Sequence, residues 1–129
     1  MDTVKEILSN CKTIAVVGIS TDGARASNRV AKYLMEQGYQ VIPVNPKESS
    51  VLGKTCYPDL KAVPEKVDVV DVFRRSEDVA PIVDQAIEIG AGAVWMQEGI
   101  TNETAALKAR QAGLKVVQDR CIMKEHRLL

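Results

Sequence analysis

The chain has 129 residues, and its 17 basic side chains are matched by 17 acidic ones, so its net charge is zero. This length suits one domain with a substantial core and leaves no room for a second catalytic domain. The even balance of charge excludes the general basic surface that holds nucleic acid, so any anion site must be local.

The three cysteines, Cys11, Cys56 and Cys121, show no CxxC spacing, and the chain has only one histidine that could join them in a metal site. An odd set of cysteines without metal-ligand spacing is typical of a reduced intracellular protein. The first residues lack the basic region and apolar stretch of a signal peptide, and no apolar run approaches the roughly 18 residues of a membrane span. We therefore expect a cytoplasmic protein with no metal site and no membrane partner.

The predicted elements begin with a helix over residues 3–10 and an apolar strand over 13–17. A glycine-containing turn follows the strand, and a segment with helical spacing then runs to Gly38, where a left-handed cap costs little. A second strand covers residues 40–44 and leads into Asn45-Pro46-Lys47.

The rest of the chain repeats this alternation of short apolar runs and helical segments. The predicted strands are 67–73, 92–96 and 114–118; a short helical turn covers 59–62, helices cover 76–90 and 101–113, and a cap covers 120–127. Short runs rich in Val and Ile, separated by helices, are typical of a parallel sheet that is covered on both faces.

The sequence therefore predicts one α/β domain over residues 1–129, a Rossmann-like, doubly wound, five-stranded parallel sheet in three layers. A reversal of direction after the third strand gives the strand order 3-2-1-4-5. The ligand crevice is then expected between strands one and four, at the carboxyl ends of the strands.

The turn after the first strand is similar to a dinucleotide-binding turn, which has glycines at its first, third and sixth positions. The chain has Gly18, Ser20 and Gly23 at these positions. The small Ser20 still allows a phosphate to approach, and the amides that open the next helix provide the positive end of its dipole. Such a turn on its own could also be purely structural.

The end of the second strand differs from that of NAD-binding proteins, which place Asp or Glu there to hold the ribose hydroxyls. This chain has Asn45-Pro46-Lys47 instead. A cation at this place favours a ligand with an extra phosphate on the ribose, such as coenzyme A or NADP.

Arginines stand at two places where an anion could bind. Arg25 opens the helix after the first turn, and Arg74 and Arg75 follow the third strand. Adjacent guanidinium groups at the carboxyl edge of a sheet suit anion binding, but surface arginines often stay solvated. A salt bridge of Arg74 or Arg75 with Asp71 or Asp78 is the alternative.

No set of nucleophile, base and oxyanion donors converges in the sequence. Cys121 and His126 could act as nucleophile and base, but a buried thiol and a packing histidine are favoured. Cys56 could form a mixed disulfide with CoA if it is exposed, and Glu98 is a lone acid without a partner. Trp95 lies within a strand and is expected in the core, with a subunit interface or a stacking platform for the ligand as the alternatives. We therefore assign no catalytic residue.

Short motifs at the ends of the predicted strands extend through nearly the whole chain. They are Val17-Gly-Ile-Ser20, Gly38-Tyr-Gln-Val-Ile-Pro-Val-Asn-Pro46, Leu52-Gly53, Tyr57-Pro58, Asp71-Val-Phe-Arg-Arg75, Val94-Trp-Met-Gln-Glu-Gly-Ile100 and Asp119-Arg-Cys121. In this order they resemble the CoA-binding domain family, which includes the amino-terminal domain of the succinyl-CoA synthetase alpha chain. The resemblance is strongest to the small stand-alone members of the family.

The resemblance implies coenzyme A or an acyl-CoA as ligand, in an extended site along the sheet edge. It assigns Gly18, Ile19, Ser20, Arg25 and Ser27 to the pyrophosphate, Asn45, Pro46 and Lys47 to the adenosine and its 3′-phosphate, Phe73, Arg74 and Arg75 to the adenine, and Gln97, Glu98 and Gly99 to the pantetheine arm. In the synthetase, the catalytic histidine and the nucleotide site lie in a further domain and another subunit, and neither is encoded in these 129 residues.

The leading hypothesis is a non-catalytic CoA-binding protein that acts as a carrier, sensor or partner module in acyl-CoA metabolism. The alternatives are an NADP-binding redox or sensing domain, and the CoA-binding half of a two-component acyl-CoA ligase with a catalytic partner protein. We also expect a homodimer, because Trp95, Met96 and the tail Leu128-Leu129 offer apolar surface for a contact.

Overall fold

The structure is a computed structural model that describes residues 3–129. Its main sheet consists of parallel strands in the order β2-β1-β5-β6-β7. Their bounds are β1 Thr13–Val17, β2 Gln40–Val44, β5 Val69–Val72, β6 Ala93–Met96 and β7 Lys115–Val117. All residues of β1, β5 and β6 are buried, as expected for strands covered on both faces.

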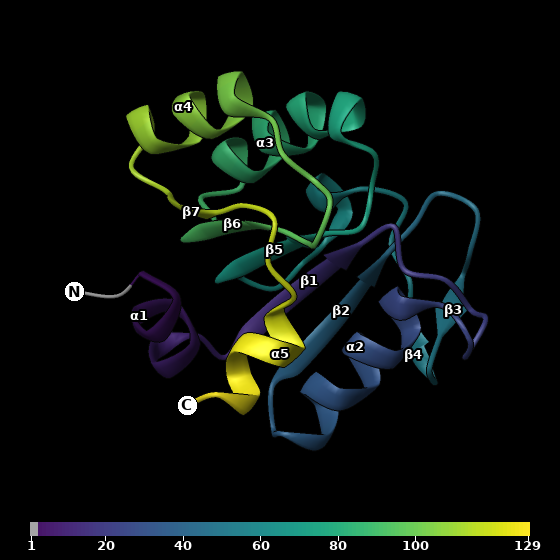
Figure 1. The fold of residues 1–129 in the computed structure, drawn as a ribbon. Coiled ribbons are helices and arrows are strands. Elements are labelled where there is room, and N and C mark those ends of the chain that lie inside the picture. Colours follow the sequence, from purple (N-terminus) through teal and green to yellow (C-terminus); the bar gives the residue numbers. More distant parts are fainter. Residues whose placement is uncertain (1–2) are drawn as a thin grey trace.

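Within the described residues, five α-helices cover the two faces of the sheet, and the predicted three layers are confirmed (Figure 1). Helices α3 and α4 lie on one face, while α1, α2 and α5 lie on the other. Their bounds are α1 Thr3–Asn10, α2 Ala26–Glu36, α3 Val79–Glu88, α4 Glu103–Gln111 and α5 Ile122–Arg127. Within residues 3–129, none of these helices has the length and apolar character needed to cross a membrane.

The predicted α/β class and the five-stranded parallel sheet are confirmed, and the strand order is corrected. Counted along the chain, the main strands lie in the order 2-1-3-4-5, because β5 pairs with β1. The connection from β2 to β5 packs Leu60 on the face of α3 and α4, opposite the face that α2 covers. A right-handed crossover on that face must run back past β1, so the switch point lies between β1 and β5.

A β-hairpin that the sequence analysis did not predict lies between β2 and β5. It consists of β3 (Ser50–Val51) and β4 (Lys54–Thr55), joined by Leu52 and Gly53, which both have positive φ angles of 53° and 73°. Two-residue hairpin turns of this mirror-image type need positive φ at both positions, and the Gly at the second position was the available signal.

The part of the chain that the structure describes also contains two short 3₁₀-helices. The predicted turn at 59–62 appears as η1 (Leu60–Ala62), capped by the Asp59 side chain, which accepts the Ala62 amide at 3.0 Å. The helix expected from Ser76 begins as η2 (Ser76–Asp78) before α3.

Trp95 and Met96 are fully buried, which confirms the core assignment of Trp95 and removes both residues from the surface expected to support a homodimer.

Candidate functional site

The carboxyl ends of β1, β2, β5 and β6 bring the predicted site residues to one edge of the sheet (Figure 1). A cavity of about 270 Å³ opens there between the turn after β1 and the start of α2. Its lining consists of Gly18, Ser20, Arg25, Ala26, Ser27 and Phe73. Five of these residues belong to the set predicted from the sequence, and we call this space the α2 cavity.

Gly18 is required because the residues that directly follow β1 and β5 approach each other closely. Its φ angle is +88°, and a Cβ atom at this position would lie 2.4 Å from the backbone oxygen of Phe73. Only glycine allows both the left-handed conformation and this close approach. The glycine therefore serves the packing of two strand ends, besides the access to the α2 cavity that the sequence suggests.

Hydrogen bonds within the protein fix the shape of the turn. The Ser20 amide donates to Ser27 Oγ at 2.9 Å, and Asn28 Nδ2 donates to the Ser20 oxygen at 2.9 Å. The Asp22 amide donates to Ser20 Oγ at 3.0 Å. Because Ser27 and Asn28 are buried side chains of α2, the helix holds the turn directly over its own amino terminus.

The first amides of α2 remain available to a ligand. Within residues 3–129, neither the Ala26 nor the Ser27 amide donates to a protein acceptor. Arg25, the residue before the helix, has an extended backbone, is exposed and forms no ion pair with any described residue. Free amides at the positive end of a helix, with a guanidinium beside them, suit an anion such as a phosphate.

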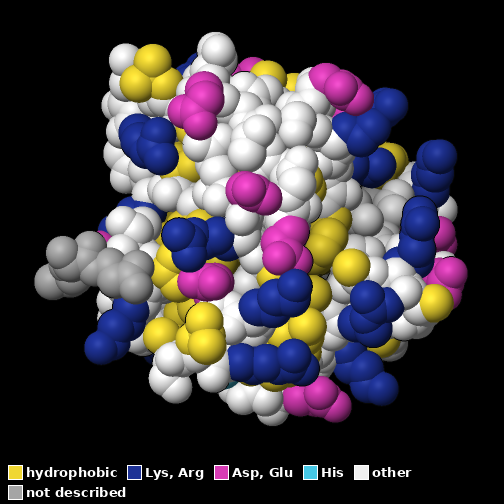
Figure 2. Space-filling view, viewed as in Figure 1, with side chains coloured by type: hydrophobic (Ala, Val, Ile, Leu, Met, Phe, Trp, Pro, Cys, Tyr) yellow, Lys and Arg dark blue, Asp and Glu magenta, His cyan; other side chains and the backbone are white. Residues whose placement is uncertain are grey.

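Asn45 ties the end of β2 to the same turn. Its Nδ2 donates to the Ile19 oxygen at 2.8 Å, and its Oδ1 accepts the Lys47 amide at 2.9 Å. The side chain of Asn45 is therefore used within the protein, whereas Lys47 is exposed and has no ion-pair partner among residues 3–129. In Figure 2, Lys and Arg side chains gather over α2 and next to the hairpin.

A second cavity of about 280 Å³ lies on the other side of the ends of β1 and β5. It is lined by Val17, Val44, Pro46, Pro58, Asp59, Leu60, Arg74, Asp78, Ile82 and Gln85. Arg74 forms no ion pair with a described residue, whereas Arg75 pairs with Glu77 at 3.2 Å and with Asp78 at 3.3 Å. Of the two predicted arginines, Arg75 thus takes the salt-bridge alternative.

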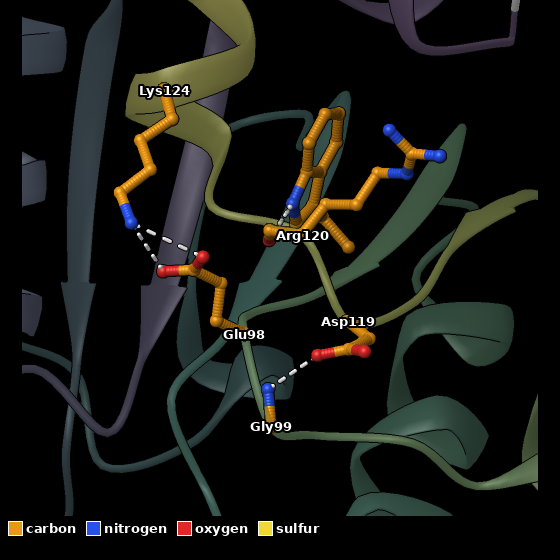
Figure 3. A network of polar contacts seen from close by, with 6 residues as sticks. Glu98, Gly99, Asp119, Arg120 and Lys124 are labelled. Atoms are coloured by element: carbon orange, nitrogen blue, oxygen red, sulfur yellow. Dashed lines mark hydrogen bonds and ion pairs between the residues drawn. The ribbon is translucent and has the colours of Figure 1, made fainter.

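The loop after β6 is held by contacts on both sides, and two of them are drawn in Figure 3. Lys124 Nζ lies 3.0 and 3.2 Å from the two carboxylate oxygens of Glu98, and the Gly99 amide donates to Asp119 Oδ1 at 2.7 Å. Gln97 is buried, and its Nε2 donates to Asp71 Oδ1 at 2.6 Å. The three residues predicted along a pantetheine arm therefore all have partners within the protein.

Asp71 is the residue of this region that the sequence analysis missed as a feature of the site. Its side chain is fully buried in β5, and within the described chain Oδ2 has no hydrogen-bond partner. Burial raises the pKa of Asp71 from 3.8 to about 8, and the hydrogen bond from Gln97 lowers the pKa only in part. The available signal was an acid in the middle of the apolar run Val69-Val-Asp-Val72.

Neither Cys11 nor Cys56 has the lowered pKa of an activated thiol. Burial and the nearby Asp68 raise the pKa of Cys11 to about 11, and burial raises the pKa of Cys56. Cys56 is buried, which argues against the exposed thiol needed for a mixed disulfide. Cys121 is buried as well, and His126 Nδ1 lies 2.6 Å from the hydroxyl of Tyr33. No group of metal-ligating side chains occurs within residues 3–129.

A third cavity, of about 220 Å³, lies at the opposite, amino-terminal edge of the sheet. Its lining includes Glu6, Cys11, Lys66, Asp68 and Lys115. In contrast to the α2 cavity, it has acidic and basic side chains side by side, and Glu6 forms an ion pair with Lys115.

Comparison with known proteins adds a decisive observation to this geometry. A CoA-binding domain family matches residues 12–127, which is nearly the whole chain. The chain belongs to the CoA-binding domain family. The predicted resemblance is therefore confirmed, and the matched segment contains every part of the α2 cavity.

Stand-alone proteins of similar size and larger enzymes are both among the relatives of this family member. The chain is 39% identical to the uncharacterized protein YneT of Bacillus subtilis, over 95% of the chain and 91% of that protein. A hypothetical protein of Pyrococcus horikoshii has a solved structure with 45% identity and a TM-score of 0.96, covering 100% of this chain and 92% of that one. The ADP-forming acetate–CoA ligase I of Archaeoglobus fulgidus is 30% identical over 86% of the chain, which spans only 18% of that enzyme.

Proposed function

We propose that this protein binds coenzyme A or an acyl-CoA at the carboxyl edge of its sheet and acts as a non-catalytic carrier, sensor or partner module. The observation that carries the proposal is the α2 cavity, where the amides of Ala26 and Ser27 have no acceptor within residues 3–129. A CoA-binding family member with an open, preformed anion site suits a ligand that carries a pyrophosphate.

In this proposal, the pyrophosphate lies over the start of α2, with Arg25 beside it. Lys47, which is exposed and has no ion-pair partner within the described part of the chain, contacts the 3′-phosphate as a flexible point charge. The adenine lies near Phe73 and Arg74, between the α2 cavity and the neighbouring cavity of about 280 Å³. Arg75 contributes less, because its guanidinium already faces two carboxylates.

The pantetheine arm follows the loop after β6 at Gln97, Glu98 and Gly99. The side chains of Gln97 and Glu98 are already engaged with Asp71 and Lys124, so this loop offers the arm a fixed surface rather than free side chains. Among residues 3–129 no nucleophile and base are in contact at this edge, so in this proposal the chain binds the thioester and leaves its chemistry to another protein.

A catalytic partner is the second candidate, and the relationship to the acetate–CoA ligase favours it. The chain spans 18% of that enzyme, and in this second proposal a catalytic partner protein supplies the functions that lie outside the matched segment. The cytoplasmic location and the homodimer stay predictions, and the homodimer now depends on Leu128 and Leu129, which are 80% and 59% exposed.

Native mass spectrometry of the purified protein, followed by calorimetry, tests the proposal. We expect co-purified CoA and an order of affinity in which CoA exceeds dephospho-CoA, NADP and NAD. Binding of NADP in preference to CoA would support the redox or sensing alternative. Absence of CoA binding by both methods would contradict the proposal.

A further inference from the structure

The carboxyl group of Asp71 has no role in the site as described so far, although its burial in β5 is costly. The side chain is fully buried, and the neighbouring residues in register are Val16 of β1 and Trp95 of β6. A buried polar group without full hydrogen bonding costs free energy that an apolar residue at the same position would avoid. The one hydrogen bond that the Asp71 side chain forms in the described chain therefore indicates what the carboxyl group does.

That contact leads directly to the loop after β6. Gln97 Nε2 donates to Asp71 Oδ1 at 2.6 Å, and both side chains lie in the interior. The backbone of Gln97 adds only a long hydrogen bond of 3.4 Å to Val72, and its oxygen accepts the Ile100 amide at 2.9 Å. The side-chain pair is thus the shortest link between the central strand β5 and the first residue of the loop.

The outer contacts of the same loop are exposed to solvent. Glu98 and Lys124 have side chains that are 56% and 61% exposed, and the bond from Gly99 to Asp119 also lies at the surface (Figure 3). Exposed ion pairs hold a loop weakly because water and salt compete with them. The interior pair, shielded from water, is the contact that can fix the base of the loop.

We propose that Asp71 is a positioning residue, which holds Gln97 and thereby sets the loop Gln97–Ile100 for the pantetheine arm. This inference rests on the proposed function, since the loop is the surface assigned to the arm. The role requires an oxygen acceptor at position 71. It does not require a negative charge, because Gln97 provides only an amide donor.

Two substitutions separate positioning from simple packing. Asp71→Asn keeps an oxygen of the same shape for Gln97, whereas Asp71→Val keeps a strand-forming residue and removes the acceptor. We expect Asp71→Val to bind CoA at least about tenfold more weakly, and Asp71→Asn to bind within about threefold of the unmodified protein. Calorimetry with CoA measures both.

Hydrogen exchange of the peptide that covers residues 97–102 gives a readout that does not depend on CoA. Exchange there should be roughly tenfold faster in Asp71→Val and unchanged in Asp71→Asn, with the turn at residues 18–27 unaffected in both. If Asp71→Val does not fold, Gln97→Met removes the hydrogen-bond donor instead and should accelerate hydrogen exchange in the same peptide.

Folded Asp71→Val or Gln97→Met protein with normal exchange at residues 97–102 would overturn the inference. The inference would also be overturned if Asp71→Asn bound CoA as weakly, and exchanged as fast at residues 97–102, as Asp71→Val. An oxygen acceptor alone would then be insufficient. If the unmodified protein fails to bind CoA, the proposed function fails, while the exchange measurements still decide whether Asp71 positions the loop.

Discussion

Two regions of the same sheet edge differ in how their polar groups are used. At the turn after β1, hydrogen bonds shape the backbone, while the first amides of α2 and the side chain of Arg25 have no protein partner within the described residues. At the loop after β6, Gln97, Glu98 and Gly99 are each bonded to another part of the chain. The first region therefore has donors and a cation left over for a ligand, whereas the polar groups of the second region are already paired within the protein.

This difference suggests that the two regions contribute differently to binding. Free amides and cations supply attraction for phosphates, so substitutions there should lower affinity with little effect on the fold. Groups that are already hydrogen-bonded hold the loop in shape. Substitutions of these groups should therefore lower the local stability of the loop first and, as a consequence, the affinity for the ligand.

The pH dependence of folding should reveal the buried carboxyl group of the closed region. Its pKa is about 8 in the folded protein against 3.8 for the free group, so the folded state keeps a proton that the unfolded state loses between these values. Stability should therefore fall as pH rises from about 4 to 8, by up to several kcal/mol. Urea unfolding of the unmodified protein and of Asp71→Asn across this pH range isolates the contribution of the Asp71 carboxyl group to the free energy of unfolding. Parallel pH profiles in the two proteins would show that Asp71 is not protonated in the fold.

Gly18→Val should destabilise the fold by roughly 3 kcal/mol or more, because the new Cβ meets the backbone oxygen of Phe73 in a left-handed conformation. Any loss of CoA binding in this variant must therefore be separated from its loss of stability. Gly23→Ala is the matched control, since a Cβ at Gly23 has no atom within 4 Å. Equal unfolding midpoints for the two variants in urea would refute the packing role of Gly18.

Lys47→Ala should weaken CoA binding by roughly 10- to 150-fold, since a charge-assisted contact contributes about 1.5–3 kcal/mol. Binding of dephospho-CoA should hardly change, because the lysine is assigned to the 3′-phosphate. Lys54→Ala, an exposed lysine of the hairpin, is the control for a general loss of positive charge. Equal losses for the two lysine variants, measured by calorimetry, would remove the specific role of Lys47.

Lys124→Ala should have the smallest effect. Its ion pair with Glu98 is exposed on both sides, and such pairs contribute little. We expect an unfolding midpoint indistinguishable from that of the unmodified protein and a CoA affinity changed by less than about threefold. A larger loss than in Asp71→Val would mean that the surface contact, rather than the interior one, holds the loop.

Much of the fold followed from sequence periodicity, because local signals and tertiary packing agree in this chain. The strands 13–17 and 40–44 and the helix 3–10 have the predicted bounds. The strand order did not follow, since it depends on which face Leu60 covers between β2 and β5, and no local pattern encodes that choice. The hairpin was missed because its strands have two residues each, too few for a periodic signal.

The site shows the same division between local and distant information. The turn at Gly18 and the cation at Lys47 are encoded in neighbouring residues and were predicted. The partners of Gln97 and Glu98 come from Asp71 and Lys124, which are 26 residues away in each case, so they emerged only with the structure. Met96 was misjudged because its burial depends on the cover that α3 and α4 provide, which the strand itself does not specify.

We propose that the α2 cavity binds the phosphates of CoA. The most direct test is titration of ¹⁵N-labelled protein with CoA, followed by amide NMR. The account predicts that the largest shifts occur at Ser20, Ala26 and Ser27, with smaller ones at Lys47 and Gly99. Shifts confined to the amino-edge cavity around Glu6, Cys11 and Lys66, or no shifts at millimolar CoA, would contradict it.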